Sequence, residues 1–482
     1  MIDKGYIYYE DNKRIFINTS LGCTGKCSYC YLPKIGYSNK EIISKSKKCN
    51  EILEMIKENK IDINKETIIT IGCFSECFDN FNKEETINII KYFLEKGNQV
   101  QVSTKKKLYE RDIEKIEKSI KYYGQFILFV SSATISKHEK IEENTDLPKE
   151  RFENFKYISK FPVILYMKPI LKNITYSDIE LYKKVIEYYK IEKIVVGSIF
   201  TEEKSEETVH FSKENKLFYN EIEDEEKIIK ELEKKVEVYR RSTEVVKEYK
   251  KQFNNIKIAR KEVSKILGND KSGHAMDHIE RVYNLALKFA KSEKEKTNKE
   301  VIGLIALLHD VDDYKQVGKE NSEKLINSRE IIDKIDVDEK TKEQILEELV
   351  RIGYSKSLKG IRPKTIEGKI VSDADMCDAS GSSGIIRIHQ YCINKDIPFF
   401  DIDSFPMEDI NEEKYTRVKT KSGVCHMFEK ILKLEKCMMT EEGRKEAKYR
   451  EQIIIDFLYH LFEEVNSDKW KRYLDEYLEK RK

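Results

Sequence analysis

The first 220 residues alternate short β-branched runs with helix-length amphipathic spacers, and this alternation constrains the fold more than any other feature of the chain. Six runs have the length of strands: residues 14–20, 67–73, 99–104, 126–132, 162–170 and 193–200. Strands separated by helix-length segments usually pair in parallel, and the sites of such sheets lie at the carboxyl ends of the strands. The pattern therefore predicts a domain over residues 1–220 with a partial (β/α)6 TIM-like barrel.

The pattern changes after residue 220. Residues 221–254 are more than half charged, and their apolar residues recur at helical spacing, which predicts a connecting helix. From residue 255 to residue 482 the apolar spacing is helical throughout. The sequence therefore predicts an α/β domain, a connecting helix and an all-α domain, in that order.

Composition narrows the class of protein. Hydrophobic residues make up 39% of the 482 residues and charged residues 37%, which is typical of globular domains with a well solvated surface. The balance of 89 Lys and Arg against 87 Asp and Glu does not favour a dominant polyanion-binding surface. Because the chain opens with no secretory signal and has no long apolar run, we expect a cytoplasmic protein without a membrane segment.

Cys23, Cys27 and Cys30 form a CxxxCxxC triplet directly after the first predicted strand. A [4Fe-4S] cluster normally takes four thiolates, so a triplet leaves one iron free for a small ligand, for which S-adenosyl-L-methionine (SAM) is the candidate. A zinc site is the alternative, but zinc usually takes four protein ligands and only three are local. The fourth zinc ligand would have to come from Cys49, Cys73 or Cys77.

Residues 1 to about 215 resemble the radical SAM superfamily, and the stretch CTGKCSYCYL carries this resemblance. The branch of the superfamily that is most similar is the spore-photoproduct-lyase-like one, on the stretches GCFSECFDNFNKEET and VSTKK. The resemblance implies that the three cysteines hold a [4Fe-4S] cluster whose open iron is chelated by SAM. It also implies a flavodoxin- or ferredoxin-type electron donor. Residues 72–76, Gly-Cys-Phe-Ser-Glu, stand where the family usually has Gly-Gly-Glu. The resemblance implies that SAM is contacted by Ser75, by Lys105, by Ser131 or its neighbour Ser132, and by Tyr29, which would lie beside the adenine.

Histidines and carboxylates recur in three blocks of the second half: GHAMDHIERV at 273–282, LLHDVDDYK at 307–315 and EGKIVSDADMCDASGSSGIIR at 367–387. Imidazoles and carboxylates together suit a divalent hard or borderline metal. Each residue alone could be an ordinary helix-end group. Their occurrence in this order favours a metal site.

This series resembles the HD phosphohydrolase superfamily over about 255–465, where the closing pattern HMFEKILKLEKCMMTEEGRKEA is also similar to that of a small-protein subgroup. The resemblance implies hydrolysis of a phosphate ester or anhydride with Mn, Mg, Co, Ni or Fe as the divalent metal, and His309 and Asp310 as catalytic residues. The metal ligands that it implies are His278, His309, Asp310 and Asp375, with Asp373 the rival for the last place. The candidates for holding the phosphate are Lys315, Lys356 and Arg387.

Together these features predict a bifunctional enzyme that combines SAM-cleaving radical chemistry with divalent-metal-dependent hydrolysis of a phosphoester or nucleotide phosphate. A small, nucleotide-like substrate would suit both halves. One alternative is a radical SAM enzyme that repairs or modifies nucleic acid and carries an accessory HD domain. Another is an iron-sulfur and nucleotide-binding sensor without turnover.

Overall fold

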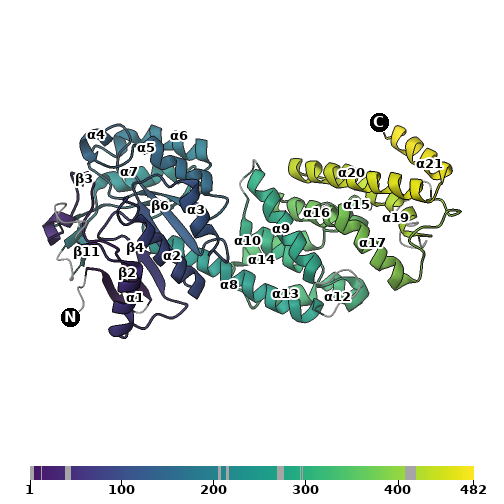
Figure 1. Ribbon diagram of the computed structural model, residues 1–482, viewed down its shortest axis with the longest axis horizontal. Helices are drawn as coiled ribbons and strands as arrows, with labels where there is room; N and C mark the ends of the chain where they lie inside the picture. Colours follow the sequence, from purple (N-terminus) through teal and green to yellow (C-terminus); the bar gives the residue numbers. More distant parts are fainter. Residues whose placement is uncertain are drawn as a thin grey trace. The chain divides into compact units, whose positions relative to one another are not determined.

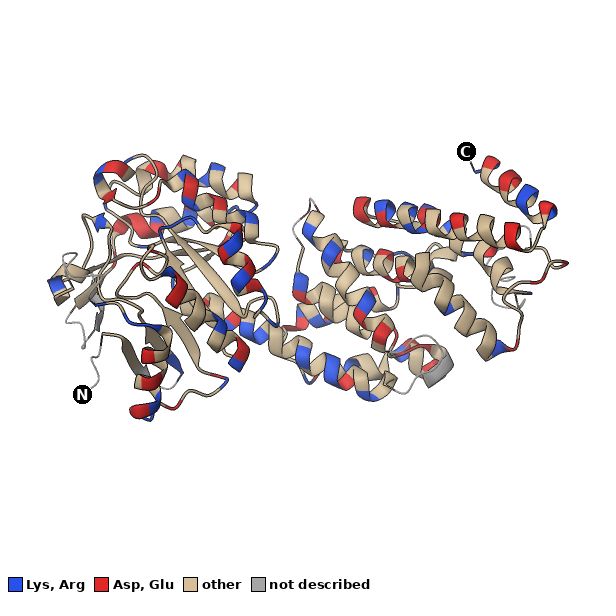
Figure 2. Ribbon diagram, viewed as in Figure 1, with Lys and Arg blue, Asp and Glu red and all other residues tan. Residues whose placement is uncertain are grey.

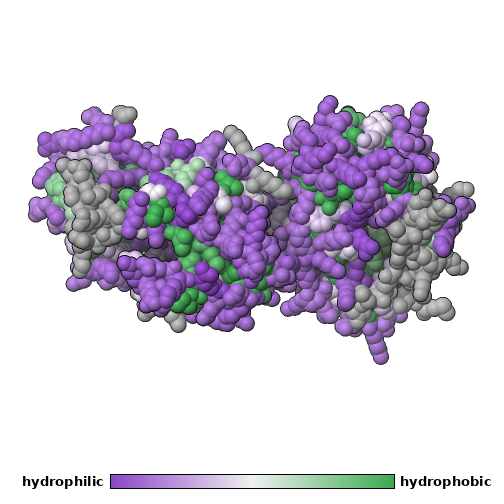
Figure 3. Space-filling view, turned by 180° about the vertical axis from the view of Figure 1, so that it is seen from behind, coloured by the Kyte–Doolittle hydropathy of each residue, from purple (hydrophilic) through white to green (hydrophobic). Residues whose placement is uncertain are grey.

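The structure is a computed structural model, and it describes residues 5–11, 13–37, 45–204, 208–212, 217–268, 276–293, 295, 297–407 and 420–481. The chain divides into two compact units, Met1–Phe253 and Asn254–Lys482 (Figure 1). Each unit has hydrophobic clusters made of its own residues. The face drawn in Figure 3 is mostly hydrophilic, with hydrophobic areas that are small and separate. In the described ranges no helix is long and apolar enough to cross a membrane.

The N-terminal unit is built on an eight-stranded sheet with the order β1-β2-β4-β5-β6-β8-β9-β13. Only β1 runs antiparallel, and every pairing from β2 to β13 is parallel. The parallel α/β fold predicted from the sequence is therefore confirmed, and each of the six predicted runs contains a strand. The strands are β1 (Ile7–Asp11), β2 (Arg14–Ile17), β4 (Ile68–Ile71), β5 (Val100–Thr104), β6 (Phe126–Ser131), β8 (Val163–Met167), β9 (Lys193–Val196) and β13 (Glu237–Tyr239).

The two faces of this sheet are covered differently. One face packs against the crossover helices, and its core includes Ile69, Val100 and Leu165. The other face carries Ile127 and Ile164, which cluster with the first turns of α8. The crossover helices include α1 (Cys49–Glu58), α2 (Lys83–Lys96), α3 (Glu110–Glu117), α6 (Ile179–Tyr189) and α7 (Glu223–Leu232). A small sheet of β10 (Ile199–Thr201), β12 (Leu217–Asn220) and β11 (Thr208–Ser212) follows β9.

The connecting helix predicted over residues 221–254 is wrong. This segment forms α7, then strand β13, then the first half of α8 (Ser242–Leu267). Val238 and Tyr239 pair in parallel with Ile194 and Val195, so the segment completes the sheet. The helical spacing of its apolar residues concealed a short strand whose stability comes from the open edge of β9. The division between the two units falls inside α8, after Phe253.

The C-terminal unit consists of helices, as predicted (Figure 1). Its centre is α10 (Lys299–Leu308), which begins where the Asn298 side chain accepts hydrogen bonds from the next turn, and in which every residue from Val301 to Leu308 is buried. A helix that is apolar on all sides has to be surrounded. It contacts α9 (Met276–Ser292), α14 (Glu339–Leu349) and α16 (Ile366–Asp378). Further helices are α15 (Tyr354–Leu358), α17 (Gly381–Lys395), α19 (Gly423–Glu429), α20 (Glu441–Glu464) and α21 (Asp468–Glu479).

Candidate functional sites

The cysteine triplet lies on the loop after β2. Gly22 bridges to Ser75, and its N–H donates to the carbonyl of Phe74 over 2.9 Å, so the loop begins beside the carboxyl end of β4. The N–H of Gly25 donates to the Cys23 Sγ over 3.3 Å. A Cβ placed on Gly25 would lie 3.3 Å from the Cys23 Sγ and 4.0 Å from the Cys27 Sγ. The glycine therefore leaves open the space that these two thiols border.

The zinc alternative would need a fourth thiolate beside Cys23, Cys27 and Cys30, because a structural zinc site usually has four protein ligands. Burial and the nearby Glu76 raise the pKa of Cys23 to about 12, a shift that bound iron would reverse.

Three of the predicted SAM contacts, Tyr29, Lys105 and Ser131, meet around the carboxylate of Glu142. The Lys105 Nζ donates to the Ser131 Oγ over 3.0 Å, and it lies 4.0 Å from the Glu142 Oε1 and 5.7 Å from the centre of the Tyr29 ring. The Tyr29 hydroxyl donates to the same oxygen of Glu142. The structure therefore brings the cysteine loop together with the carboxyl ends of β5 and β6. Ser132, the alternative to Ser131, instead lies 3.1 Å from the Tyr182 hydroxyl.

Glu142 is a site residue that the sequence analysis missed. Its Oε2 lies 2.8 Å from the Arg151 Nη1, and both side chains are fully buried. The Arg151 Nη1 also donates to the carbonyl of Ser131 over 2.8 Å. Burial would raise the pKa of Glu142, but Lys105 and Arg151 lower it. Neither Glu142 nor Arg151 lies in a recognisable sequence motif. Only the fold shows that this buried ion pair lies next to the predicted SAM contacts.

Ser75 and Glu76 follow β4, in the Gly-Cys-Phe-Ser-Glu stretch. The Ser75 Oγ is buried, and within the described part of the chain it has no hydrogen-bond partner. Such a hydroxyl fits a polar ligand, since a buried polar group without a partner is costly. Glu76 accepts hydrogen bonds from the Thr104 hydroxyl and, over 2.9 Å, from the N–H of Lys105. Glu76 therefore fixes the end of β5, from which Lys105 extends.

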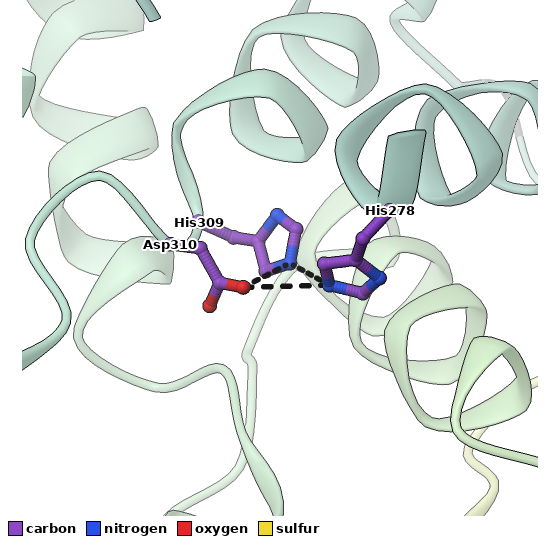
Figure 4. Close-up of side chains that lie close together, drawn as sticks. All are labelled: His278, His309 and Asp310. Carbon is purple, nitrogen blue, oxygen red and sulfur yellow. Dashed lines mark hydrogen bonds and ion pairs between the residues drawn. The ribbon is translucent and has the colours of Figure 1, made fainter. Parts of the chain in front are cut away.

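In the C-terminal unit, His278 from α9, His309 and Asp310 after α10, and Asp375 from α16 converge on one point. His278 Nε2 and His309 Nε2 are 3.2 Å apart. The Asp310 Oδ2 lies 3.4 Å and 3.6 Å from these two nitrogens (Figure 4). The Asp375 Oδ1 lies 3.5 Å and 3.7 Å from them. All four predicted ligands are therefore together.

These distances are equal to or slightly longer than those of a mononuclear metal centre. With metal–ligand bonds of about 2.1 Å, neighbouring donor atoms are roughly 3.0–3.4 Å apart in octahedral or tetrahedral geometry. Burial alone would lower the pKa of His309, but the Asp310 and Asp375 carboxylates raise it to about 9. The two facing nitrogens and the two carboxylates thus form a site that favours positive charge, either a proton on His309 or a metal ion.

Hydrogen bonds at the far side of each ring assign its tautomer. The His309 Nδ1 lies 2.8 Å from the carbonyl of Ala306, and the His278 Nδ1 lies 2.7 Å from the Asp378 Oδ2. A carbonyl or carboxylate at Nδ1 assigns the proton to that nitrogen, which leaves the Nε2 lone pair for a metal. Arg387 Nη1 also lies 3.1 Å from the His278 Nδ1, but the contact of that nitrogen with Asp378 is shorter. On these contacts both imidazoles are oriented as ligands.

Asp378 is the second site residue that the sequence analysis missed. Its carboxylate accepts hydrogen bonds from Arg281 over 2.7 Å and from Arg387 over 2.9 Å. Burial would raise the pKa of Asp378, but hydrogen bonds from His278 and Arg281 hold it well below its usual range. Asp378 lies on α16 three residues after Asp375, so the two carboxylates share one face of the helix. This spacing is the feature of the sequence from which Asp378 could have been predicted.

Asp373 faces a different part of the unit. Its carboxylate accepts from the N–H of Met439 over 3.0 Å and from the N–H of Thr440 over 2.7 Å, so it binds the start of α20. Of the phosphate candidates, Lys356 is exposed on α15, Arg387 contacts Asp378, and the side chain of Lys315 lies outside the described residues.

Known proteins match both halves of the chain. The family model of the radical SAM superfamily matches residues 17–186, and that of the HD domain matches residues 275–380. The uncharacterized protein YpgQ of Bacillus subtilis (strain 168) is 27% identical over 207 residues, which cover 42% of this chain and 90% of YpgQ.

Solved structures similar to each half are also known. An HD-superfamily hydrolase from Bacillus thuringiensis is 27% identical, with a TM-score of 0.36, and the match covers 45% of this chain and 100% of that chain. Spore photoproduct lyase, in complex with a dinucleoside spore photoproduct, is 13% identical, with a TM-score of 0.35, and the match covers 46% of this chain and 75% of that chain.

Proposed function

From the radical SAM domain and the HD domain that this chain contains, we propose that it is a bifunctional enzyme. The N-terminal unit cleaves SAM to start radical chemistry on a substrate. The C-terminal unit uses a divalent metal to hydrolyse a phosphoester or nucleotide phosphate. A small nucleotide-like molecule is the proposed substrate, and a flavodoxin- or ferredoxin-type protein is the proposed electron donor.

The observation that carries the hydrolytic half is that the Asp310 and Asp375 oxygens each lie 3.4–3.7 Å from the two imidazole nitrogens, which are 3.2 Å apart. A divalent ion bound there would lower the pKa of a coordinated water and neutralise charge on a phosphoryl group. The protein's part is positional: Asp378 and the carbonyl of Ala306 orient the two rings, so that little reorganisation is needed when the ion binds.

For the N-terminal unit, Cys23, Cys27 and Cys30 would hold the cluster. A reduced [4Fe-4S] cluster with bound SAM supplies a 5′-deoxyadenosyl radical that can abstract a substrate hydrogen. The chain's own side chains do the positioning. Glu142 holds Tyr29 and stands beside the ammonium of Lys105, while the Ser75 hydroxyl is available to a polar group of SAM.

The charge distribution supports a small substrate over nucleic acid. Lys and Arg are interspersed with Asp and Glu on the helices of the N-terminal unit in Figure 2. Binding of nucleic acid draws on a continuous basic surface. A radical enzyme acting on nucleic acid is therefore the less favoured alternative.

The hydrolytic proposal is tested with full-length protein freed of metal and then supplied with Mn, Mg, Co, Ni or Fe and a panel of nucleotides. We expect release of phosphate or pyrophosphate, and its loss in His309→Ala and Asp310→Ala. His389→Ala, at an exposed histidine of α17, is the matched control and should keep full activity. Turnover that survives in both site variants would refute the metal centre.

The radical proposal is tested by anaerobic reconstitution with iron and sulfide, followed by dithionite and SAM. We expect formation of 5′-deoxyadenosine, and its loss together with bound iron in Cys23→Ala. Cys437→Ala, in the C-terminal unit, should behave like the unmodified protein. SAM that binds but stays intact with several reductants would instead favour the sensor hypothesis.

A further inference from the structure

A lysine that the proposed chemistry does not use lies at the carboxyl end of β8. Side chains alternate between the two faces of a strand, so Lys168 follows Ile164 and Tyr166 on the face that packs against α8. Its Nζ lies 4.5 Å from the centre of the Tyr219 ring, on β12. A Cβ placed on Gly197 would lie only 3.0 Å from the Lys168 Cδ, so the glycine gives the lysine stem its path. Lys168 therefore extends from the edge of the sheet where the sites of parallel folds are found.

The ammonium of Lys168 has a carboxylate nearby but no direct ion pair in the part of the chain that the structure describes. The carboxylate that raises its pKa is Glu225, which pairs with Arg240 at 3.2 Å and accepts from Ser198. Burial is the main cause that lowers the pKa of Lys168 to about 8, and Arg14 adds to the effect. A largely buried cation in this setting is stabilised when an anion binds.

A second, independent source of positive potential is the start of α8. This helix begins at Ser242, and its first turns pack on the sheet face that carries Tyr166, two residues before Lys168. The amino end of a helix carries a partial positive charge and unpaired N–H groups. Lys168 and the amino end of α8 therefore both contribute positive potential at the same end of the sheet.

Aromatic rings connect this point with the cysteine loop. The ring centre of Tyr219 is 5.1 Å from that of Phe200, on β10, and Phe200 is 6.2 Å from Tyr31. Tyr31 directly follows Cys30 and donates to the carbonyl of Cys73 over 2.7 Å. The row Tyr31, Phe200 and Tyr219 therefore runs from the cluster loop to Lys168, with neighbouring rings tilted by 58° to each other.

We propose that Lys168 and Tyr219 form an anion-binding subsite for the substrate of the radical domain. The phosphate of a nucleotide-like molecule binds the Lys168 ammonium, and the rest of the molecule lies along the aromatic row toward the cluster. The assignment of this subsite to the substrate rests on the proposed radical function. The binding of an anion is tested separately from SAM cleavage.

The test is residue-level acetylation of the reconstituted full-length protein with a water-soluble N-hydroxysuccinimide ester, read by peptide mass spectrometry. AMP, adenosine and succinate are the probes, and the exposed Lys34 is the internal reference. We expect AMP at about ten times its dissociation constant to slow labelling of Lys168 about tenfold, because only the small unbound fraction of sites then reacts. Tyr219→Leu should weaken the protection while leaving Lys168 available for labelling.

Each outcome is decisive. Protection by AMP and not by adenosine supports a phosphate subsite, and protection by succinate as well supports an anion subsite that also accepts a carboxylate. Equal protection by adenosine and AMP, or unchanged labelling with every probe, overturns the inference. Formation of 5′-deoxyadenosine in the same preparation shows separately whether the radical function holds.

Discussion

Two buried carboxylates, Asp378 and Glu142, each orient a residue of the proposed site in their own unit. Each is held by arginine, and each positions a residue of a proposed site: Asp378 orients His278, and Glu142 accepts from Tyr29. A charged acceptor that is itself fixed restricts both the orientation and the protonation of its partner. These carboxylates therefore belong to the functional sites although they are not proposed to bind metal.

Asp378→Asn should lower the affinity of the C-terminal site for Mn(II) by about 10- to 100-fold, the usual effect of losing a partner behind a histidine ligand. The amide no longer accepts strongly from the His278 Nδ1–H, so the ring is less firmly oriented. Competition with a metal indicator measures the affinity. Unchanged affinity would show that Asp378 serves only the packing around its arginines.

Asp375→Asn and Asp373→Asn form a matched pair on one helix. The first should abolish Mn(II) binding with little loss of stability in the metal-free protein, because Asp375 faces the two histidines. The second should keep the metal but lower the free energy of unfolding by about 1–3 kcal/mol, because it weakens the bonds to the start of α20. Metal titration and thermal unfolding read the two effects, and a reversed outcome would exchange the roles of the two residues.

At the scale of elements, the turn after β4 depends on close approach of its own chain. Gly72 has φ +87°, and a Cβ there would lie 1.9 Å from the Cys77 Sγ, which is fully buried. The same turn supplies Phe74 and Ser75, which hold the beginning of the cysteine loop. The glycine thus links the packing of Cys77 to the geometry of the cluster site.

Gly72→Ala should destabilise the N-terminal unit by at least about 3 kcal/mol, since backbone strain and a steric clash add together. Gly36→Ala is the control: its φ is +89°, but nothing lies within 4 Å of the new Cβ, so the cost should stay near about 1 kcal/mol. Denaturant unfolding compares the two variants. Equal losses would mean that the backbone angle alone matters and that Cys77 can move aside.

At the scale of the whole molecule, the chain consists of two compact units with separate cores and separate sites. A ligand that binds only a folded unit stabilises that unit by mass action. The metal of the C-terminal unit and the cluster of the N-terminal unit should therefore act on different unfolding transitions.

Removal of metal with a chelator should lower one calorimetric transition and leave the other unchanged. Metal at 100 times its dissociation constant contributes about 2.7 kcal/mol to the unit that binds it. His309→Ala should make the sensitive transition indifferent to chelator and so assign it to the C-terminal unit. A shift of both transitions by the same amount would show that the two units unfold together.

Features encoded by neighbouring residues could be predicted from the sequence alone. The parallel strands, the helical second half and the cysteine loop follow from patterns along a few residues, whereas the His and Asp ligand set is what the resemblance to the HD superfamily implies. The family comparisons and the fold support the architecture. Strand β13 could not be predicted, because its stability depends on the edge of β9, more than 40 residues earlier.

The sequence by itself determined which chemical groups each half presents, because ligand type and spacing are local properties. Only the tertiary structure decided between Asp373 and Asp375, since two residues apart on a helix means about 200° of rotation, and the packing of α16 against α9, α10 and α20 decides which face meets the histidines. The same holds for Glu142, Asp378 and Lys168. Each acts through partners that are distant in the chain, and such partners meet only when the sheet and the helix bundle are assembled.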